Sequence, residues 1–417
     1  MPHERDRATN VLAMVGLPAR GKTYIARRLA RYLNWLGHST RVFNVGSYRR
    51  RQLGASQPAD FFSPANATGR AVLNELAMNA LDDMIDWLQD GGEVGIFDAT
   101  NSTKERRKVV EERTRKAGVP LVFIESLCND ASVVEANVRE TKLSSPDYTD
   151  MDPEAATRDF LQRIAHYESM YETLDDPGQS YIKIIDVGRQ VTLNRIHGYL
   201  PARLAPLLID MHVSPRPIWL TRHGQSMYNV HGRIGGDPEL SPAGEEYARN
   251  LAQFVRQHAS RDAEVGVWTS TMTRTIQTAT HLTRSPRAWR ALDEIDAGVC
   301  DGMTYDQMRI ELPDVWSARQ ADKFRYRYPR GESYEDVIQR LDPVIIQLER
   351  QRSPILVIAH QAVLRAIYAY LMALPPSDCP SLSIPLHTVI QLTPTAYGCE
   401  EKRFALPPNV EDQGAGG

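Results

Sequence analysis

The stretch Gly16–Thr23 (GLPARGKT) places the tightest constraint on how this chain can fold. It matches the pattern G-x-x-x-x-G-K-[ST] at every fixed position. The apolar stretch Val11–Val15 before it predicts a strand, and apolar residues at helical spacing follow it, namely Ile25, Leu29, Leu33 and Leu36. Between a strand and a helix, such a loop turns its backbone N–H groups toward one point, where the helix dipole also favours an anion. The pattern therefore predicts a phosphate-binding loop in an α/β domain.

Polar side chains in and near this loop indicate the chemistry. Lys22 is expected to reach the β- and γ-phosphates of a nucleotide, and the Thr23 hydroxyl to ligate Mg²⁺. Asp98 follows a second predicted strand, and ligand sites in open α/β sheets lie at the carboxyl ends of strands. Asp98 could hold Mg²⁺ or its water, or orient an attacking hydroxyl; alternatively, it caps the helix that follows. The basic residues nearby could together bind a second anionic substrate: Arg49, Arg50, Arg51, Arg106, Arg107 and Lys142.

Short apolar, β-branched stretches alternate with helical patterns along the whole chain. The predicted strands are Val11–Val15, Arg41–Val45, Val94–Phe97, Leu121–Glu125, Ile182–Val187, Ile218–Thr221, Gly266–Thr269, Ile355–Ala359 and Val389–Leu392. Strands separated by helices predict parallel sheets with right-handed crossovers. The proline-marked stretch Ser214–Pro217 interrupts the alternation. With 417 residues, the chain is long enough for two domains, which we place at residues 1–214 and 215–417.

Composition excludes several classes of function. The formal charge of −3 gives no overall basic field, so we expect no nucleic-acid partner. No apolar stretch reaches the roughly 18 residues that span a bilayer, so we expect no membrane association. The four cysteines, Cys128, Cys300, Cys379 and Cys399, form no C-x-x-C pair and show no metal spacing. Free thiols fit a reducing compartment, and the prediction is a cytoplasmic protein.

The second half contains two histidines at predicted strand ends. His223 lies between Arg222 and Gly224 after one strand, and His360 follows another. With Arg222 and Arg274, they predict a phosphate pocket that works without metal. A neutral imidazole nitrogen can attack phosphorus in line, while cationic groups stabilise the equatorial oxygens.

Such a reaction also needs an acid to protonate the leaving alkoxide. Glu294 is our candidate, with Asp293 and Asp296 as alternatives on spacing alone. His387 is interpreted as structural, because nothing near it in the sequence supplies a partner.

Text between these motifs carries a family resemblance. Stretches such as RVFNVGSYRR, FDATNSTKERR, RHGQSMYNVHGRIGGDPELSP, RYRYPRGESYEDVIQRLDPVI and PLHTVIQLTPTAYGC resemble the bifunctional 6-phosphofructo-2-kinase/fructose-2,6-bisphosphatases over residues 11–400. The resemblance implies a parallel sheet like that of P-loop nucleoside monophosphate kinases, followed by a phosphoglycerate mutase-like histidine phosphatase domain. It also implies ATP, Mg²⁺, fructose 6-phosphate and fructose 2,6-bisphosphate as ligands, no cofactor for the phosphatase half, and a homodimer formed through the kinase halves.

For the kinase half, the resemblance assigns roles to individual residues. ATP·Mg would be held by the loop, that is, by Gly16, Leu17, Pro18, Ala19, Arg20, Gly21, Lys22 and Thr23, with Asn137, Lys142 and, from the C-terminal half, Tyr397. Asp98 and Cys128 match active-site positions, although direct phosphoryl transfer needs no cysteine nucleophile. The fructose 6-phosphate contacts would be Arg49, Thr100, Arg106, Lys142, Arg163 and Tyr167.

For the phosphatase half, His223 matches the histidine that becomes phosphorylated and Glu294 the acid/base. Arg222, Asn229 and His360 match transition-state stabilisers, and Arg274 matches a phosphate-binding arginine. The other bisphosphate contacts would be Gly235, Tyr305, Arg319, Lys323, Tyr334, Gln361 and Arg365.

One departure from the family pattern concerns the kinase. Leu73 falls where the family carries an arginine for the sugar phosphate, and Arg70, three residues earlier on a predicted helix, could reach the same place. The sequence leaves three interpretations of the chain. It retains both activities; it has lost one of them, and the kinase is then the better candidate for the loss; or it is a non-catalytic nucleotide sensor. Lys22, Thr23, His223, Glu294 and His360 argue against the last.

Overall fold

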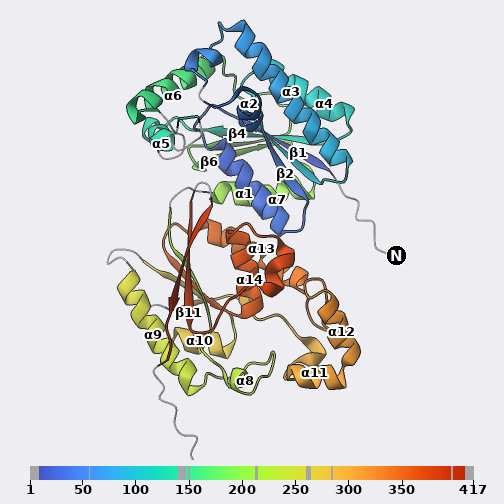
Figure 1. Cartoon of the computed structure of the whole chain (residues 1–417), viewed down its shortest axis with the longest axis vertical. Coiled ribbons are helices and arrows are strands. Elements are labelled where there is room, and N and C mark those ends of the chain that lie inside the picture. The colour runs from blue at the N-terminus through green and yellow to red at the C-terminus, as the bar shows by residue number, and fades with distance from the viewer. Residues whose placement is uncertain are drawn as a thin grey trace, which may run out of the picture. The chain divides into compact units, whose positions relative to one another are not determined.

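The chain forms two compact units, Met1–His212 and Val213–Gly417. The computed structural model describes residues 9–55, 57–139, 147–148, 151–211, 215–259, 264–282, 285–395 and 398–408. Within these residues, each unit is built on one six-stranded sheet with helices on both faces (Figure 1). The predicted class, a two-domain α/β protein, is confirmed.

The first unit has the strand order β2-β3-β1-β4-β5-β6. Its elements are β1 (Asn10–Val15), α1 (Lys22–Trp35), β2 (Thr40–Asn44), α2 (Val45–Leu53), a 3₁₀ turn (Ala59–Phe62), α3 (Ala67–Gln89), β3 (Val94–Asp98), α4 (Lys104–Lys116), β4 (Leu121–Leu127), α5 (Ala131–Asn137), α6 (Pro153–Glu168), β5 (Tyr181–Ile185), β6 (Gln190–Asn194) and α7 (Tyr199–Asp210). The strands β1 to β5 are parallel, and β6 runs antiparallel to β5.

Two details differ from the prediction. The strand predicted over Ile182–Val187 ends at Ile185, because Asp186 and Val187 take positive φ values of 48° and 56°. This turn leads directly into β6, which we did not predict. A connection this short cannot cross over the sheet, so β6 has to run antiparallel.

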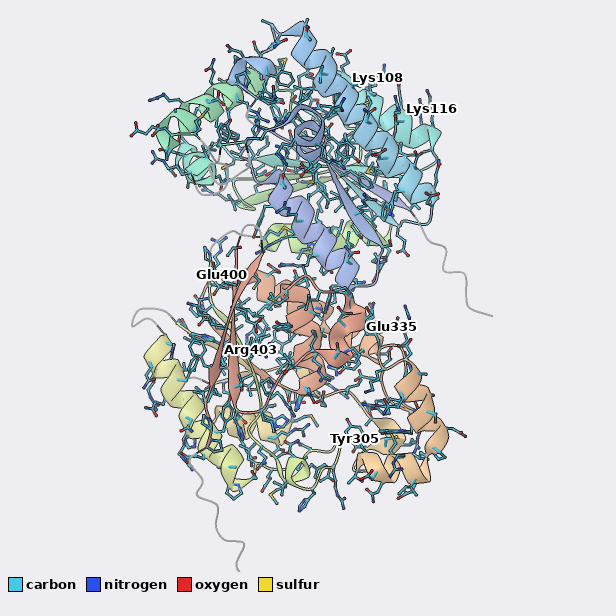
Figure 2. All side chains as sticks on the ribbon, in the orientation of Figure 1. Lys108, Lys116, Tyr305, Glu335, Glu400 and Arg403 are labelled. Atoms are coloured by element: carbon cyan, nitrogen blue, oxygen red, sulfur yellow. The ribbon has the colours of Figure 1, made fainter. Side chains whose placement is uncertain are left out.

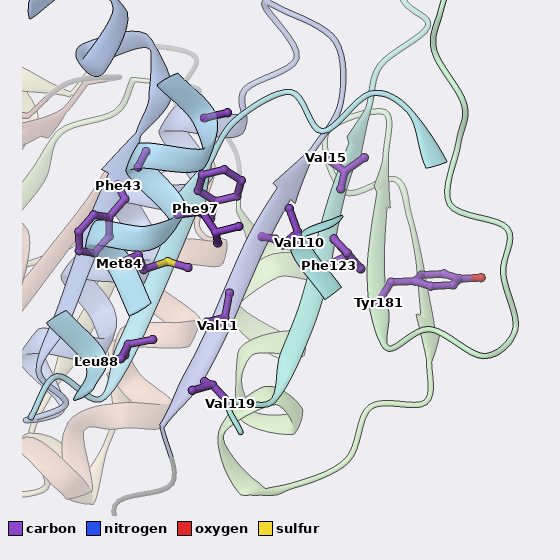
Figure 3. Close-up of a cluster of buried hydrophobic side chains, with 14 of the residues drawn as sticks. Val11, Val15, Phe43, Met84, Leu88, Phe97, Val110, Val119, Phe123 and Tyr181 are labelled. Atoms are coloured by element: carbon purple, nitrogen blue, oxygen red, sulfur yellow. The ribbon is translucent and has the colours of Figure 1, made fainter. Parts of the chain in front are cut away.

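One face of the first sheet carries an apolar core. Val11, Ala13 and Val15 of β1 share this face with Phe97 of β3 and Phe123 of β4. They pack against α3 and α4 (Figure 3), while α1 and α7 cover the opposite face (Figure 1). A strand buried on both faces reads as a continuous apolar stretch, as β1 does.

The second unit has the order β12-β11-β7-β10-β8-β9. Its elements are β7 (Ile218–Arg222), α8 (Met227–Val230), α9 (Pro242–His258), β8 (Gly266–Thr269), α10 (Thr273–Ala279), β9 (Arg287–Ala288), two 3₁₀ turns (Arg290–Leu292 and Gly298–Cys300), α11 (Tyr305–Glu311), α12 (Pro313–Ala321), α13 (Tyr334–Arg350), β10 (Ile355–Ala359), α14 (Gln361–Leu371), a 3₁₀ turn (Pro376–Ser381), β11 (Thr388–Pro394) and β12 (Cys399–Ala405). The central strands β7, β10, β8 and β9 are parallel.

The edge formed by β11 and β12 departs from the predicted parallel arrangement. The strand β11 is antiparallel to both β7 and β12, and β12 was not predicted. One face of the sheet buries Trp219, Leu356 and Ile358 against Tyr247 and Leu251 of α9. In the described parts of both units, no helix has the length and apolar character needed to cross a membrane.

Candidate active sites

The Gly16–Thr23 loop connects β1 to α1, as predicted, and close packing requires glycine in it. A Cβ on Gly16 would lie 2.5 Å from the Ser126 carbonyl oxygen at the end of β4. The Gly16 N–H donates to the Thr100 carbonyl at 2.9 Å, which ties the loop to the end of β3. Gly21 caps α1 with φ 77°, a left-handed conformation that glycine adopts without strain. The loop is therefore held by the two strands beside it.

Lys22 and Asn137 both contact backbone carbonyls of this loop. Lys22 begins α1 and is only 8% exposed, and its ammonium donates to the Leu17 carbonyl at 2.6 Å. Asn137, at the end of α5, donates to the Ala19 carbonyl at 3.2 Å. The structure thus brings Asn137 to the loop from a distant part of the sequence. Two further predicted residues, Lys142 and Tyr397, lie outside the described residues.

Asp98 is the last residue of β3 and is 3% exposed. The Asn44 side-chain amide donates to Asp98 Oδ2 at 2.5 Å, and Asn44 Oδ1 caps α2 by accepting from the Ser47 N–H. The alternative role for Asp98, as cap of the next helix, is wrong, because Thr103 caps α4. Its carboxylate lies at a strand end and is oriented by Asn44, a residue that the sequence analysis missed.

Cys128 lies in a small apolar cluster that includes Ala19 of the loop and Val134 of α5. Burial raises the pKa of its thiol. A thiol with a raised pKa is a poor nucleophile at neutral pH. This agrees with phosphoryl transfer that uses no cysteine.

A group of basic residues gathers around Asp147. The Arg49 guanidinium is buried and donates to Asp147 Oδ2 at 2.6 Å, while Arg163 Nη1 lies 4.0 Å from the same oxygen. Arg163 also stacks on the Phe62 ring, at 3.6 Å from its centroid, and the Tyr167 ring lies 6.3 Å from that of Phe62. The structure therefore brings together Arg49, Arg163 and Tyr167, which are far apart in the sequence.

Of the other basic residues, Arg107 does not belong to an anion site. It is 1% exposed, and it donates to the carbonyls of Asn101 at 3.1 Å and Glu172 at 2.7 Å. Including it in a substrate-binding set was therefore wrong: its guanidinium holds together the backbone before α4 and the backbone after α6. Arg106 instead donates to Asn74 on α3.

Arg70 lies exposed on α3, and Leu73 on the same helix is half-buried. No contact of Arg70 tests the compensation for Leu73, which stays a prediction.

In the second unit, His223 and His360 follow the adjacent parallel strands β7 and β10. The register pairs Arg222 with Ala359, so the two imidazoles come side by side, with ring centroids 5.1 Å apart. Both are buried, at 4% and 0% exposure. The two histidines thus meet at one end of the sheet, as their positions at strand ends predict.

The environment of His223 suits a nucleophile. Its Nδ1 lies 2.7 Å from the Gly224 carbonyl oxygen, which can only accept, so Nδ1 carries the proton and Nε2 is bare in the neutral ring. Burial first, and then the charge of Arg274, lower the pKa of His223 well below its ordinary value. The imidazole is therefore neutral at physiological pH, with Nε2 available to attack phosphorus.

Two arginines supply positive charge beside the histidines. Arg274, on α10, is 3% exposed and donates to the Gly236 carbonyl at 2.8 Å. Arg222, at the end of β7, donates to the Ile384 carbonyl at 3.4 Å, and burial lowers its pKa while nearby Glu294 opposes that shift. Guanidinium groups keep their charge even when buried, so they can stabilise the negative charge of a phosphoryl group bound beside the histidines.

Glu294 has the environment that suits the acid better than its two alternatives. Its Oε1 accepts from the backbone N–H of Ala362, at 3.2 Å, in the first turn of α14, next to His360. All three carboxylates accept from backbone N–H groups: Oε1 of Glu294 also accepts from Ile295 at 3.0 Å, Asp293 accepts from Thr271 at 2.8 Å, and Asp296 accepts from Gly298 at 2.8 Å. Glu294 is distinguished by its bond to α14, the helix that follows His360, and by its charge acting on Arg222, so it stays the candidate acid.

Arg340, on α13, was missed in the sequence analysis. Its guanidinium donates to the carbonyls of Ala291, Asp293 and Glu294, the last two at 2.7 and 3.2 Å. It also pairs with the Glu332 carboxylate at 2.8 Å. Arg340 therefore anchors the backbone that carries Glu294, from a position 46 residues away in the sequence.

The other predicted bisphosphate contacts lie on several elements of the same unit. Arg365 donates to the Tyr334 hydroxyl at 3.1 Å, and Arg319 donates to the Tyr328 hydroxyl at 2.7 Å. Tyr305 is 46% exposed at the start of α11 (Figure 2). The remaining four are Asn229 on α8, Gly235 in a turn against Asp301, the exposed Lys323, and Gln361 at the start of α14.

His387 has the partners that the sequence did not reveal. It accepts from the Gln225 N–H at 3.3 Å, and its ring lies 4.9 Å from that of Tyr247. These contacts fit the structural role predicted for it, although the reason given, a lack of partners, was wrong.

Comparison with known proteins gives the family. The family model for 6-phosphofructo-2-kinase matches residues 2–215, and that for the histidine phosphatase superfamily (branch 1) matches residues 218–406. A 6-phosphofructo-2-kinase/fructose-2,6-bisphosphatase from Arabidopsis thaliana is 51% identical over 95% of this chain. The chain belongs to the 6-phosphofructo-2-kinase/fructose-2,6-bisphosphatase family.

Relatives in the 6-phosphofructo-2-kinase/fructose-2,6-bisphosphatase family differ in length. The chain spans 54% of the Arabidopsis protein and 85% of a rat relative, 6-phosphofructo-2-kinase/fructose-2,6-bisphosphatase 4, which is 49% identical to it. Among solved structures, the α-ribazole phosphatase of Shigella flexneri matches 47% of this chain and 100% of its own, with 24% identity and a TM-score of 0.41.

Proposed function

We propose that this chain is a bifunctional enzyme that makes fructose 2,6-bisphosphate from fructose 6-phosphate and ATP, and hydrolyses it to fructose 6-phosphate and phosphate. One observation supports the proposal: each unit has its own group of candidate phosphoryl-transfer residues gathered at the carboxyl ends of parallel strands. In the first unit they are the Gly16–Thr23 loop and Asp98; in the second they are His223 and His360, to which Glu294 comes from a loop by its bond to Ala362. The identity of the sugar substrate, fructose 6-phosphate, is inferred from the family to which the chain belongs.

In the kinase unit, the loop N–H groups and Lys22 would hold the phosphates of ATP. The oxygens of Thr23 and Asp98 are of the type that Mg²⁺ prefers, and the bound ion would neutralise charge on the transferring group. Asp98 is buried and oriented by Asn44, which fits such a site. The set around Arg49 and Arg163 would bind the sugar phosphate and direct its 2-hydroxyl toward the γ-phosphate.

In the phosphatase unit, Nε2 of His223 would attack the phosphorus at the 2-position. The P–N bond forms as the P–O bond to the sugar breaks, and Glu294 gives its proton to the departing oxygen. Arg222, Arg274 and His360 would stabilise the equatorial oxygens. Glu294 would then take a proton from water as that water attacks the phosphohistidine, releasing phosphate and restoring both side chains.

The test is a pair of assays on the purified chain. We expect ATP-dependent phosphorylation of fructose 6-phosphate, and transient trapping of ³²P on a histidine from fructose 2-³²P,6-bisphosphate. A chain with trapping but no kinase activity would support the reading in which only the phosphatase works, which the Leu73 departure favours. Absence of both activities would leave the non-catalytic nucleotide sensor. A homodimer and a cytoplasmic location belong to the same proposal.

The acid is tested by replacing Glu294 with glutamine, which keeps the shape but removes the titrating proton. The alkoxide then leaves unprotonated, so phosphohistidine formation is expected to slow by roughly 10²–10⁴-fold in rapid-quench labelling. Asp296→Asn is the matched control: its Oδ1 can still accept from Gly298, so labelling is expected within a few-fold of wild type. Fast labelling in the glutamine variant and slow labelling in the control would move the acid role to Asp296.

A further inference from the structure

His360 makes a buried contact that the proposed mechanism leaves unused. Its Nε2 lies 2.8 Å from the hydroxyl oxygen of Ser270, the residue that follows β8. Both side chains have 0% exposure. The other ring nitrogen, Nδ1, is buried and has no hydrogen-bond partner among the described residues. Leaving a buried polar atom without a partner is unfavourable, so this nitrogen calls for an explanation.

The neighbours of Ser270 leave its hydroxyl hydrogen two destinations. Ser270 Oγ accepts from the Met272 N–H at 3.1 Å and lies 2.8 Å from the hydroxyl of Thr275. The Thr275 hydroxyl has its own acceptor, the Met272 carbonyl, at 2.8 Å. A hydroxyl donates a single hydrogen. Ser270 can therefore donate either to Thr275 or to Nε2 of His360.

The unbonded nitrogen Nδ1 of His360 decides between them, because it is the ring nitrogen left for a ligand. The His360 ring lies 5.1 Å from that of His223, whose Nε2 would attack the phosphoryl group. A phosphoryl group offers only oxygen acceptors, so a nitrogen that stabilises it has to carry a hydrogen. Burial and the charge of Arg274 lower the pKa of His360, which keeps the ring neutral. A neutral ring has one N–H, so a hydrogen on Nδ1 makes Nε2 an acceptor.

We propose that Ser270 is a positioning residue for the phosphatase reaction, donating to Nε2 of His360 and thereby holding this ring as the tautomer whose Nδ1–H faces the transferring phosphoryl group. The proposal rests on the proposed function, since it names the group that Nδ1 would contact. In the opposite tautomer, the lone pair of Nδ1 would face the phosphoryl oxygens. That arrangement replaces an attraction with a repulsion at the point where charge develops.

The first experiment compares Ser270→Ala with Ser270→Thr in the full chain. Alanine removes the donor, so kcat for fructose 2,6-bisphosphate hydrolysis is expected to fall roughly 10- to 100-fold with KM changed only a few-fold. Threonine keeps the hydroxyl and should restore kcat to within a few-fold of wild type. Thr275→Val removes a buried hydroxyl from the same network but leaves the Ser270 donor. It should therefore lower the unfolding temperature while kcat stays within a few-fold of wild type. Near-ultraviolet circular dichroism and thermal unfolding check that the second unit is folded in each variant, because the first unit has its own core and its kinase activity would not report on this.

The second experiment reads the tautomer directly by ¹⁵N-detected histidine NMR, with His360→Ala to assign the signals. Wild type is expected to carry its hydrogen on Nδ1, and Ser270→Ala to shift the signals toward the Nε2–H form. A hydrogen on Nε2 in wild type, or unchanged turnover in Ser270→Ala, would overturn the proposal. If wild type shows no phosphohistidine trapping, the proposed function fails instead, while the NMR result still reports whether Ser270 sets the tautomer.

Discussion

Replacement of His223 by alanine is expected to abolish hydrolysis of fructose 2,6-bisphosphate and ³²P labelling of the chain, while leaving ATP-dependent phosphorylation of fructose 6-phosphate largely intact. The imidazole is the group that would bond to phosphorus, and its neighbour His360 is a poor replacement because its Nε2 is bonded to Ser270. The kinase residues belong to a separate compact unit with its own core. Both activities are measured on the same preparation.

His231→Ala is the matched control for this experiment. His231 is an exposed histidine just after α8, and its loss should leave labelling and turnover within a few-fold of wild type. Equal loss of both activities in a folded His223→Ala chain would contradict the separation of the two sites. Persistent labelling in that variant would move the nucleophile to another histidine.

Lys22→Met is expected to impair the kinase and to spare the phosphatase. It should lower the kinase rate by ~10³-fold or more, about 4 kcal/mol of barrier. The Lys22 ammonium donates to the Leu17 carbonyl of the loop, so its positive charge lies within the loop. Methionine keeps the length of the side chain without the charge. Initial rates at saturating ATP and fructose 6-phosphate separate this effect from weaker binding. Labelling of His223 from the bisphosphate should stay within a few-fold of wild type.

Near-normal phosphorylation of fructose 6-phosphate by Lys22→Met would show that the Gly16–Thr23 loop is not the transfer site. Arg28→Met provides a comparison, because Arg28 lies buried on the same helix outside the loop. It is expected to lower stability rather than to impair the chemistry.

Local patterns in the sequence predicted much of the fold and where in it both groups of candidate residues lie. The strands β1, β8 and β10 read as apolar stretches because they are buried, and the residues just after them carry polar chemistry. Parallel strands bring their carboxyl ends to one edge, so His223 and His360 could be placed together before their contact was known. Family resemblance then extended the prediction to residues whose spacing alone is uninformative.

Residues that position others could not be predicted in this way. Asn44 contacts Asp98, and Ser270 contacts His360; in both pairs the partner lies in a distant segment of the sequence. Serine and asparagine are common in the loops after strands, so their presence there gives no signal. Arg107 was assigned to an anion site because charge alone cannot tell a ligand-binding arginine from one that satisfies buried carbonyls. The edge strands β6 and β12 were missed because a half-exposed edge carries too weak an apolar signal.

The Arg340 anchor bears on how this phosphatase unit can change over evolution. Arg340 grips carbonyl oxygens at positions 291, 293 and 294, and every amino acid supplies such an oxygen. The hydrogen bonds from Arg340 to this backbone therefore do not depend on which side chain is at position 294. Mutation there can exchange one functional group for another while the main chain that presents it stays in place. A change of side chain at position 294 could therefore adapt the site to a different leaving group without loss of the backbone position that Arg340 holds.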